Sequence, residues 1–497
     1  MTPTWIDESR QPSTLATAGG QHACYWTNIL GLVLADGVSF LLAHLLFRSG
    51  RAVPSLVIFS GPGPQGYSPP IDLFALLALV FIAVRYISGD YNRRQLFWDG
   101  VKLTTIALLV ASALDLLMFA IGYSLYSPTA VICSWLFLLV CLPMMRQGAR
   151  FVLSRVSIWQ IPTAVVGSNL RIAEINEALK HSLALGFDVR WLVVDGTETP
   201  IPPSLKDLTV LQPANPTDVA ASLLESGCKE TIFLAEDMQL PFFADLSQRL
   251  LELGISIAIV PSFNRLPVAG VTVNYFFGRN ILLLQARSNV QRLPSRIAKR
   301  AFDFVASAIL LILLSPVLFV LAIAIKVDTR GPITYSQKRV GRHGTQFGCM
   351  KFRTMAPNAD ELLARWQQEN PDIYKEFLVS FKLRDDPRVT PVGKWLRRTS
   401  LDELPQLWNV LCGEMSLVGP RPIPEQQLRD QYGNAAQLYV QVRPGMSGLW
   451  QISGRSETSG DQRIVLDEWY ILNWSFWYDI VILIQTARIV VSGKGAF

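Results

Sequence analysis

Charged side chains are scarce in this sequence. Asp, Glu, Lys and Arg make up 17 % of its 497 residues, whereas hydrophobic residues make up 50 %, and the mean hydropathy is +0.29. Soluble domains carry about 25 % charged residues, so the composition excludes an ordinary soluble protein and predicts a membrane protein. The net charge of +6 suits nucleic acid or an anionic membrane surface equally. The apolar segments favour the membrane, and we expect no nucleic-acid partner.

Histidine and paired cysteines are also lacking. The chain has four histidines, of which only His343 follows residue 200, and six cysteines without any C-x-x-C pair. A histidine-rich metal site in the second half is therefore excluded, and the scattered cysteines are interpreted as reduced thiols.

A complete glycine fingerprint for dinucleotides is missing as well. From about Ile161 the pattern becomes that of an α/β domain, with strands predicted at 163–166, 189–194, 231–234 and 255–260 and a helix at 172–181. After the first strand only Gly167 is present, whereas G-x-G-x-x-G needs three glycines around the pyrophosphate. We therefore predict a Rossmann-like domain for contacts or regulation that binds no dinucleotide.

Four apolar segments come first, at about 29–47, 71–87, 103–123 and 129–145. Each is near the ~20 residues that cross a membrane as a helix. Basic residues after the second and fourth segments predict cytoplasmic loops there and a cytoplasmic amino terminus, and the polar first 25 residues predict no cleavable signal peptide. Asp36 and Asp115 interrupt two segments. A polar partner inside a four-helix bundle is the favoured explanation, and a transport path is the alternative.

A fifth apolar stretch, residues 304–325, carries Ser315-Pro316 at its middle and positive charge at both ends. Symmetric positive flanks predict that both ends face the cytoplasm. Proline at the midpoint allows a helix to enter and leave one leaflet, although a kinked spanning helix fits the local physics equally well. We predict the re-entrant hairpin, residues 301–327, because a cytosolic substrate must reach the carboxylates described next.

Asp402 and Glu403 are adjacent carboxylates in the stretch Ser400-Leu401-Asp402-Glu403-Leu404-Pro405-Gln406. Apolar residues from Leu404 to Leu411 recur at helical spacing, and proline is tolerated only in a first helical turn, so we expect a helix to begin near Ser400 or Asp402. Free N–H groups there would keep Asp402 ionised and could bind phosphate oxygens. A capping box, with Glu403 reaching back to Ser400, is the structural alternative.

Basic residues gather at short, turn-rich motifs in the same part of the chain. Arginine matches phosphate oxygens with two parallel hydrogen bonds, so several such turns beside an acidic pair predict a diphosphate pocket. The motifs are Lys351-Phe352-Arg353, Arg384-Asp385-Asp386-Pro387-Arg388, Arg397-Arg398, Gly419-Pro420-Arg421-Pro422, Arg443-Pro444-Gly445 and Gly454-Arg455.

These motifs, with Lys299-Arg300-x-Phe302-Asp303 and Ser315-Pro316 before them, resemble the bacterial polyprenyl-phosphate sugar-1-phosphate transferases. The layout is most similar to the long members that act on galactose. The resemblance implies that a UDP-sugar gives its sugar 1-phosphate to undecaprenyl phosphate and releases UMP. It further implies a covalent phosphosugar on the aspartate of the Asp-Glu pair, and a Mg²⁺ ion.

Carried over residue by residue, the resemblance makes Asp402 the nucleophile and Glu403 a partner of the metal or of the lipid phosphate. Both carboxylates are expected to bind Mg²⁺. The phosphate- and substrate-binding residues are expected to be Lys351, Arg353, Arg397, Arg421 and Arg455.

The predicted fold class is a membrane α-helical bundle, an α/β Rossmann-like domain and a small mixed α/β catalytic domain with a re-entrant helix hairpin. The predicted divisions are a cytoplasmic segment 1–27, a bundle 28–147, a Rossmann-like domain 148–288 and a catalytic domain 289–497. We expect a homodimer in the bacterial inner membrane with its catalytic domain on the cytoplasmic face.

Several alternatives stay open at this point. The sugar could be glucose or, less favoured, an N-acetylated sugar. A membrane-anchored nucleotide-sugar dehydratase would need Tyr-x-x-x-Lys, but Tyr335 is followed by Arg339. A scaffold without catalysis would leave the paired carboxylates unexplained, and Asp385-Asp386 as a glycosyltransferase metal motif competes with a simple Asp-Pro turn.

Overall fold

The computed structural model describes residues 14–48, 73–121, 126–261, 267–356, 388–453 and 460–492, except for 92, 168, 181, 183, 195–204, 206, 212–214, 237, 239, 268–270, 276–281 and 286–291. The chain forms two compact units, Met1–Ser262 and Phe263–Phe497. Each unit is described by itself.

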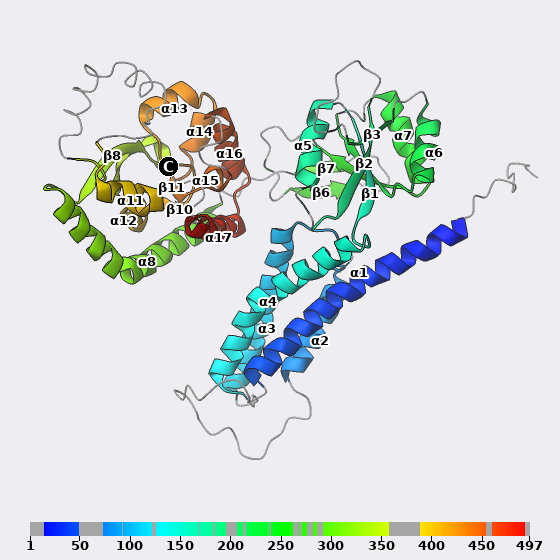
Figure 1. Ribbon diagram of the computed structural model, residues 1–497, viewed down its shortest axis with the longest axis horizontal. Helices are drawn as coiled ribbons and strands as arrows, with labels where there is room; N and C mark the ends of the chain where they lie inside the picture. The colour runs from blue at the N-terminus through cyan, green and yellow to red at the C-terminus, as the bar shows by residue number, and fades with distance from the viewer. Residues whose placement is uncertain are drawn as a thin grey trace, which may run out of the picture. The chain divides into compact units, whose positions relative to one another are not determined.

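The amino-terminal unit begins with the four predicted apolar helices, which run alongside one another in Figure 1. They are α1 (Thr14–Ala43), continued by the π-helical turn η2 (His44–Arg48), then α2 (Leu73–Ile87), α3 (Phe97–Ala120) and α4 (Pro128–Arg155). Three of them, α2 excepted because it is shorter, are long and apolar enough to cross a membrane. The predicted helical bundle is thus confirmed, and α4 continues ten residues beyond the predicted segment.

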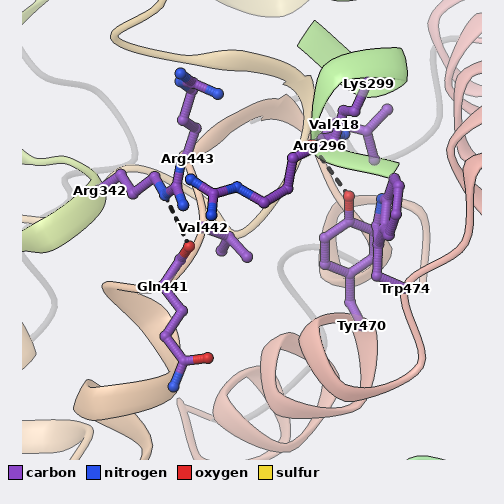
Figure 2. A pocket seen from close by; sticks show the side chains of 9 residues that line it. All are labelled: Arg296, Lys299, Arg342, Val418, Gln441, Val442, Arg443, Tyr470 and Trp474. Carbon is purple, nitrogen blue, oxygen red and sulfur yellow. Dashed lines mark hydrogen bonds between the residues drawn. The ribbon is translucent and has the colours of Figure 1, made fainter. Parts of the chain in front are cut away.

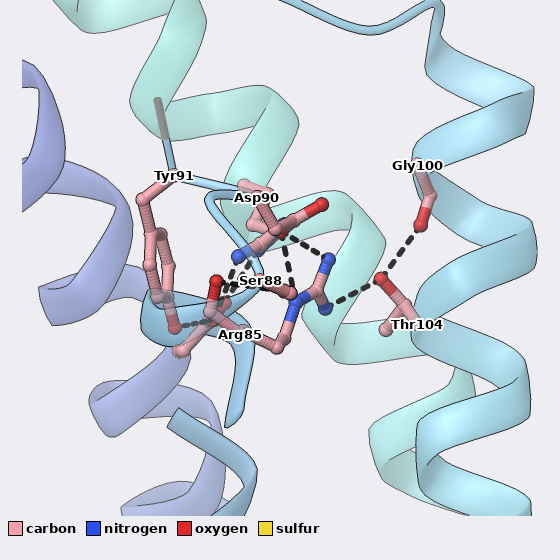
Figure 3. Close-up of polar contacts among 8 residues, drawn as sticks. Arg85, Ser88, Asp90, Tyr91, Gly100 and Thr104 are labelled. Atoms are coloured by element: carbon pink, nitrogen blue, oxygen red, sulfur yellow. Dashed lines mark hydrogen bonds and ion pairs between the residues drawn. The ribbon is translucent and has the colours of Figure 1, made fainter. Parts of the chain in front are cut away.

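A buried ion-pair network joins the bundle helices near one end. Arg146 of α4 donates to Asp36 of α1 at 2.7 Å and to Asp90 at 2.8 Å, and Asp90 also accepts from Arg85 of α2. Arg85 donates onward to Thr104 of α3 at 2.7 Å (Figure 3), and the Tyr91 hydroxyl donates to Asp36. All four helices are therefore tied together by charges that have partners.

A second buried pair lies between Asp115 of α3 and Arg48 of η2, with the Trp135 indole donating to the same carboxylate at 2.7 Å. Both acidic residues in the apolar segments thus have polar partners inside the bundle, as predicted. Arg85 and Arg146, which the sequence places in cytoplasmic flanks, are only 4 % and 5 % exposed because they face these carboxylates. Hydropathy alone could not separate a flanking cation from an internal one.

The α/β domain follows in the same unit. Its five strands are all parallel, in the order β3-β2-β1-β4-β5. The elements are β1 (Ile161–Val166), α5 (Asn169–Lys180), β2 (Phe187–Val193), β3 (Thr209–Leu211), α6 (Pro216–Glu225), β4 (Glu230–Leu234), α7 (Pro241–Glu252) and β5 (Ser256–Val260). The predicted alternation is confirmed, whereas the three-residue β3 was not predicted because its pattern is too short. The description Rossmann-like stays a prediction.

The second unit starts with a two-stranded pair, β6 (Thr272–Tyr275) and β7 (Leu282–Gln285), followed by the long helix α8 (Leu293–Asp328). The antiparallel pair β8 (Thr334–Val340) and β9 (Gln346–Phe352) and the parallel pair β10 (Ser416–Val418) and β11 (Gly445–Ser447) form its small sheets. The other elements are η5 (Arg342–Gly344), α11 (Pro391–Thr399), η6 (Leu401–Glu403), α12 (Gln406–Cys412), α13 (Glu425–Gln431), α14 (Ala435–Tyr439), α15 (Leu449–Ile452), α16 (Gly460–Leu472) and α17 (Phe476–Ser492).

Helix α8 is sharply bent near its middle (Figure 1), and Pro316 lies within it. A straight helix of 36 residues would be about 54 Å long, far beyond the ~30 Å hydrocarbon core. Instead, both halves pack against the same domain. In the first half, Asp303 accepts from the Leu417 N–H at 3.1 Å, and in the second half Leu321 and Ile325 pack with Phe352.

Between these two anchors the bend of α8 is apolar and exposed. Ile312, Leu313 and Phe319 are 72 %, 68 % and 68 % exposed. Such a surface needs an apolar surrounding, and the two anchored ends are compatible with a hairpin dipping into one leaflet. The re-entrant topology itself stays a prediction.

We expect single cysteines at Ile297 and Val327, two exposed positions near the two ends of α8, both to react with an impermeant maleimide only from the cytoplasmic face. Lys299 itself is unsuitable because it forms an ion pair with Asp479. The measurement uses a variant whose native cysteines are replaced by alanine, in intact cells and in inverted vesicles. A cysteine at Ser127, between α3 and α4, is the control for the outer face. Labelling of either α8 position from outside would show a spanning helix instead.

Candidate active site

The paired carboxylates lie in a tight connection between two helices. Helix α11 ends at Thr399, Ser400 takes a left-handed conformation with φ of 57°, and Asp402 and Glu403 form the 3-10 turn η6. Helix α12 begins only at Gln406, after Pro405, and ends at Gly413 with φ of 87°. The left-handed Ser400 separates α11 from η6, so the carboxylates lie in a 3-10 turn instead of a regular α-helical turn.

This geometry corrects the sequence-based prediction in two respects. The predicted α-helix beginning at Ser400 or Asp402 starts four to six residues later, because residues 401–403 form a 3-10 turn and the regular α-helix starts only at Gln406. The capping-box alternative is also wrong, since the Ser400 side chain makes no cap hydrogen bond. Glu403 is instead bound by Lys351.

Lys351 and Arg421 flank the Glu403 carboxylate. The Lys351 Nζ, on strand β9, donates to Glu403 Oε1 at 2.7 Å, and Arg421 Nη2 lies 3.8 Å from the same oxygen. Two cations from separate motifs therefore meet one of the two adjacent acids. The structure brings these predicted residues together from positions 52 and 18 residues away in the chain.

Asp402 lies in a less polar environment than expected. Burial, and then the neighbouring Glu403 charge, raise the pKa of Asp402 from its usual 3.8 to about 6, whereas Lys351 and Arg397 act in the opposite direction. We expected free N–H groups at a helix start to hold this pKa low, but desolvation and the adjacent acid outweigh them. Asp402 is nevertheless mostly ionised at neutral pH.

Arg397, on α11, reaches the same region. Its Nε donates to the Thr354 hydroxyl at 2.9 Å, and its charge is among those that act on Asp402. Thr354 was not predicted as a site residue, although its position directly after Lys351-Phe352-Arg353 is a signal that could have been used. It positions an arginine next to the acid.

The remaining predicted residues lie elsewhere. Arg353 is buried and donates to the backbone carbonyl and the hydroxyl of Thr329, at 2.8 and 2.7 Å, so it fastens the end of α8 to strand β9. Arg455 lies outside the described residues. Ser315 and Pro316 lie within α8, where the Ser315 hydroxyl donates to the Ile312 carbonyl at 2.8 Å.

Trp450 is a further residue beside this site. Arg421 and Arg463 both lie over its ring, at 5.7 and 4.8 Å from the centroid. An aromatic face next to the phosphate-type arginine is suited to stack on a planar group. Sequence reasoning missed Trp450 because a single tryptophan in an aromatic-rich region carries no motif.

A magnesium ion fits the donor set of the site only together with substrate. Within the described residues no three His, Cys, Asp or Glu side chains are grouped closely enough to hold a metal by themselves. Mg²⁺ is commonly bound by one or two carboxylates, water and substrate phosphates, which is what Asp402 and Glu403 can offer. The acid pair is therefore compatible with a metal that arrives with a diphosphate.

The comparisons with known proteins identify the family of this chain. Residues 294–493, which contain α8 and both carboxylates, match the family described as bacterial sugar transferase. Two relatives that are 35 % identical over most of their length are also named as transferases of this kind. The chain therefore belongs to this family of transferases. The predicted family is confirmed.

Two relatives that match most of the chain are named for galactose. The chain is 35 % identical over 412 residues to the undecaprenyl-phosphate galactose phosphotransferase of Salmonella typhimurium, covering 82 % of this chain and 84 % of that protein. It is 35 % identical over 474 residues to the UDP-galactose-lipid carrier transferase of Erwinia amylovora, covering 93 % and 97 %. A Klebsiella pneumoniae UDP-glucose:undecaprenyl-phosphate glucose-1-phosphate transferase is 29 % identical over 447 residues, covering 85 % and 90 %.

Proposed function

We propose that the protein transfers a sugar 1-phosphate, most favourably galactose 1-phosphate, from a UDP-sugar to undecaprenyl phosphate, and so forms the first lipid-linked intermediate of a surface polysaccharide. The observation that carries the proposal is the acid pair Asp402 and Glu403 with Lys351 2.7 Å from Glu403 and Arg421 beside it. Galactose is favoured because two relatives named for it that match most of this chain are 35 % identical, whereas a glucose-named relative that matches a similar share of the chain is 29 % identical.

In the first half of the reaction, a carboxylate oxygen of Asp402 attacks the phosphorus that carries the sugar. The new phosphorus–oxygen bond forms as the bond to the bridging oxygen of the diphosphate breaks, and UMP leaves with that electron pair. No base is needed, because Asp402 is mostly ionised at neutral pH. Lys351, Arg397 and Arg421 would stabilise the charge on the phosphoryl oxygens.

In the second half, an oxygen of undecaprenyl phosphate attacks the same phosphorus and the bond to Asp402 breaks. The carboxylate is regenerated and a lipid-linked diphosphate sugar is formed.

A Mg²⁺ ion held by Asp402, Glu403 and the diphosphate would neutralise charge on the transferring group. Helix α8 would hold the domain at the cytoplasmic surface of the inner membrane, where the lipid headgroup is found.

The test offers the purified protein undecaprenyl phosphate and a panel of UDP-sugars, and measures UMP release and lipid-linked product. We expect UDP-galactose to give the highest rate. A higher rate with UDP-glucose would change the sugar but keep the reaction, whereas no UMP release with any UDP-sugar would refute the proposed reaction.

The raised pKa of Asp402 predicts that the rate of the first half-reaction falls at a higher pH than for an ordinary aspartate. Because the pKa of Asp402 is raised to about 6, its ionised fraction is large at pH 7.5 and falls by roughly tenfold for each pH unit well below 6. We therefore expect the single-turnover burst of UMP to slow about tenfold between pH 6.5 and pH 5. Calorimetric binding of the UDP-sugar at each pH is the control. A burst that keeps its rate down to pH 4.5 would indicate an ordinary aspartate.

A further inference from the structure

A second basic pocket lies in the catalytic unit, apart from the acid pair. It is open to solvent on one side, and its cavity volume is about 50 Å³. Its walls come from the start of α8, from η5, from the loop before β11 and from α16 with the turn that follows it (Figure 2), and they comprise Arg296, Lys299, Arg342, Val418, Gln441, Val442, Arg443, Tyr470 and Trp474. Arg443 belongs to the Arg443-Pro444-Gly445 motif, for which the proposed reaction has no role.

This pocket lies at the opposite end of α12 from the carboxylates. Asp402 and Glu403 lie four and three residues before the first residue of that helix, whereas Arg443 donates at 2.7 Å to the carbonyl of Gly413, which directly follows its last residue. Arg300, from α8, donates to the Leu411 carbonyl at 2.8 Å in the same last turn. Seven helical residues span about 10 Å, so a phosphate in this pocket would not reach Asp402.

Two arginines of this pocket, Arg296 and Arg342, form no ion pair in the described part of the chain. They reach toward one another from opposite sides (Figure 2). Arg342 is held in place by the Gln441 carbonyl at 3.0 Å. Burial, Arg296 and Arg443 all lower the pKa of Arg342, which shows that the guanidinium groups disfavour one another. A bound anion would remove this repulsion.

The acid paired with Lys299 is already engaged by neighbours. Asp479 of α17 forms an ion pair with Lys299 and accepts hydrogen bonds from the Tyr470 hydroxyl at 2.7 Å and the Trp474 indole at 3.0 Å. It therefore neutralises Lys299 only. Arg296 and Arg342 are therefore available to an external anion. The hydrogen bonds to Asp479 fix the positions of Tyr470 and Trp474 at the side of the pocket.

Apolar surface continues from the pocket along α8. Ile297, next to Arg296, is 59 % exposed, and Phe304 and Val305 are 50 % and 53 % exposed. A free nucleotide has no apolar chain that could cover these side chains, whereas the acyl chains of a lipid would cover them. Basic residues beside tryptophan and tyrosine are typical of the headgroup level of a membrane.

We propose that this pocket binds the phosphodiester headgroup of an anionic glycerophospholipid, with Arg296 and Arg342 on the phosphate and the acyl chains along the exposed apolar side of α8. The site is distinct from the one that would accept undecaprenyl phosphate. It does not depend on the assignment of Asp402, because none of its residues takes part in the proposed transfer.

The test measures retention of phosphatidylglycerol by the purified full-length protein in neutral detergent, using native mass spectrometry. The variant carries both Arg296→Gln and Arg342→Gln, and Arg429→Gln is the matched control, because Arg429 is an exposed arginine on α13 paired with Glu425. We expect the double variant to bind phosphatidylglycerol at least about tenfold more weakly than the wild type and the control, since two basic contacts are lost. The UMP burst should stay within about twofold of the wild type, showing that the variant is folded.

Competition distinguishes the sources of phosphate. Phosphatidylcholine, inorganic phosphate and UMP should leave the retained phosphatidylglycerol in place at equal concentration. Equal retention by the double variant and the wild type would overturn the site. Displacement by UMP or inorganic phosphate would identify a site for free phosphate. Displacement by undecaprenyl phosphate at lower concentration would identify the carrier-lipid site. Either result would overturn the phospholipid assignment.

Discussion

Replacing Asp402 with asparagine is expected to abolish the trapped phosphosugar adduct and to lower the rate of lipid-linked product by at least about 10³-fold. The amide has no anionic oxygen to attack phosphorus, and the loss of a covalent nucleophile is not compensated by neighbours that only bind phosphate. The measurement combines intact-protein mass spectrometry after incubation with UDP-galactose and the single-turnover release of UMP.

The variant should be folded, because burial already disfavours the ionised form of Asp402, and its neutral isostere removes that cost. Asp430→Asn is the matched control, since Asp430 is exposed on α13 and the chemical change is the same. Full activity of the Asp402 variant would refute its role as nucleophile, whereas equal loss in the control would point to a general effect of the substitution.

Replacing Arg146 with methionine is expected to destabilise the helical bundle strongly. Within the described part of the chain, Asp36 would then keep the Tyr91 hydroxyl as its polar partner but no cation. A buried carboxylate that loses its ion-pair partner costs about 3–5 kcal/mol of stability. We expect a strong drop in unfolding temperature in detergent, whereas Arg155→Met, an exposed change on the same helix, should have little effect.

The matched rescue is the double variant Asp36→Leu with Arg146→Met, which removes both charges. Asp90 would still be paired with Arg85. Exchanging a buried ion pair for apolar side chains is often neutral or stabilising, so the double variant should recover most of the lost stability. A single Arg146→Met variant that unfolds at the wild-type temperature would show that the network does not stabilise the bundle.

The elements that follow from hydrophobic spacing were predictable. The bundle helices and four of the five parallel strands lie where the pattern places them, because their signal is local. The acid pair and Lys351 were also predictable, since each belongs to a distinctive short motif. What the motifs could not supply is the direction of each side chain. Lys351 lies on β9 and contacts Glu403, whereas Arg353, which directly follows that strand, contacts Thr329.

Features that depend on long-range packing were not predictable. Ser400 is left-handed, residues 401–403 form a 3-10 turn and α12 starts only at Gln406, and no residue type in this stretch predicts that arrangement. The raised pKa of Asp402 results from burial by segments that are distant in sequence. The partners of Asp36 and Asp115 required the helices to be packed before they could be named.

The two anchors of α8 have a consequence for the lipid environment. Asp303 on its first half and Ile325 on its second half fix both arms to the domain that carries the carboxylates. Under the proposed topology, the height of Asp402 above the headgroups is set by these protein contacts and by one leaflet alone. The thickness of the opposite leaflet would therefore not enter the geometry of the reaction, and a catalyst held in this way would retain its alignment with the carrier phosphate in bilayers of different thickness.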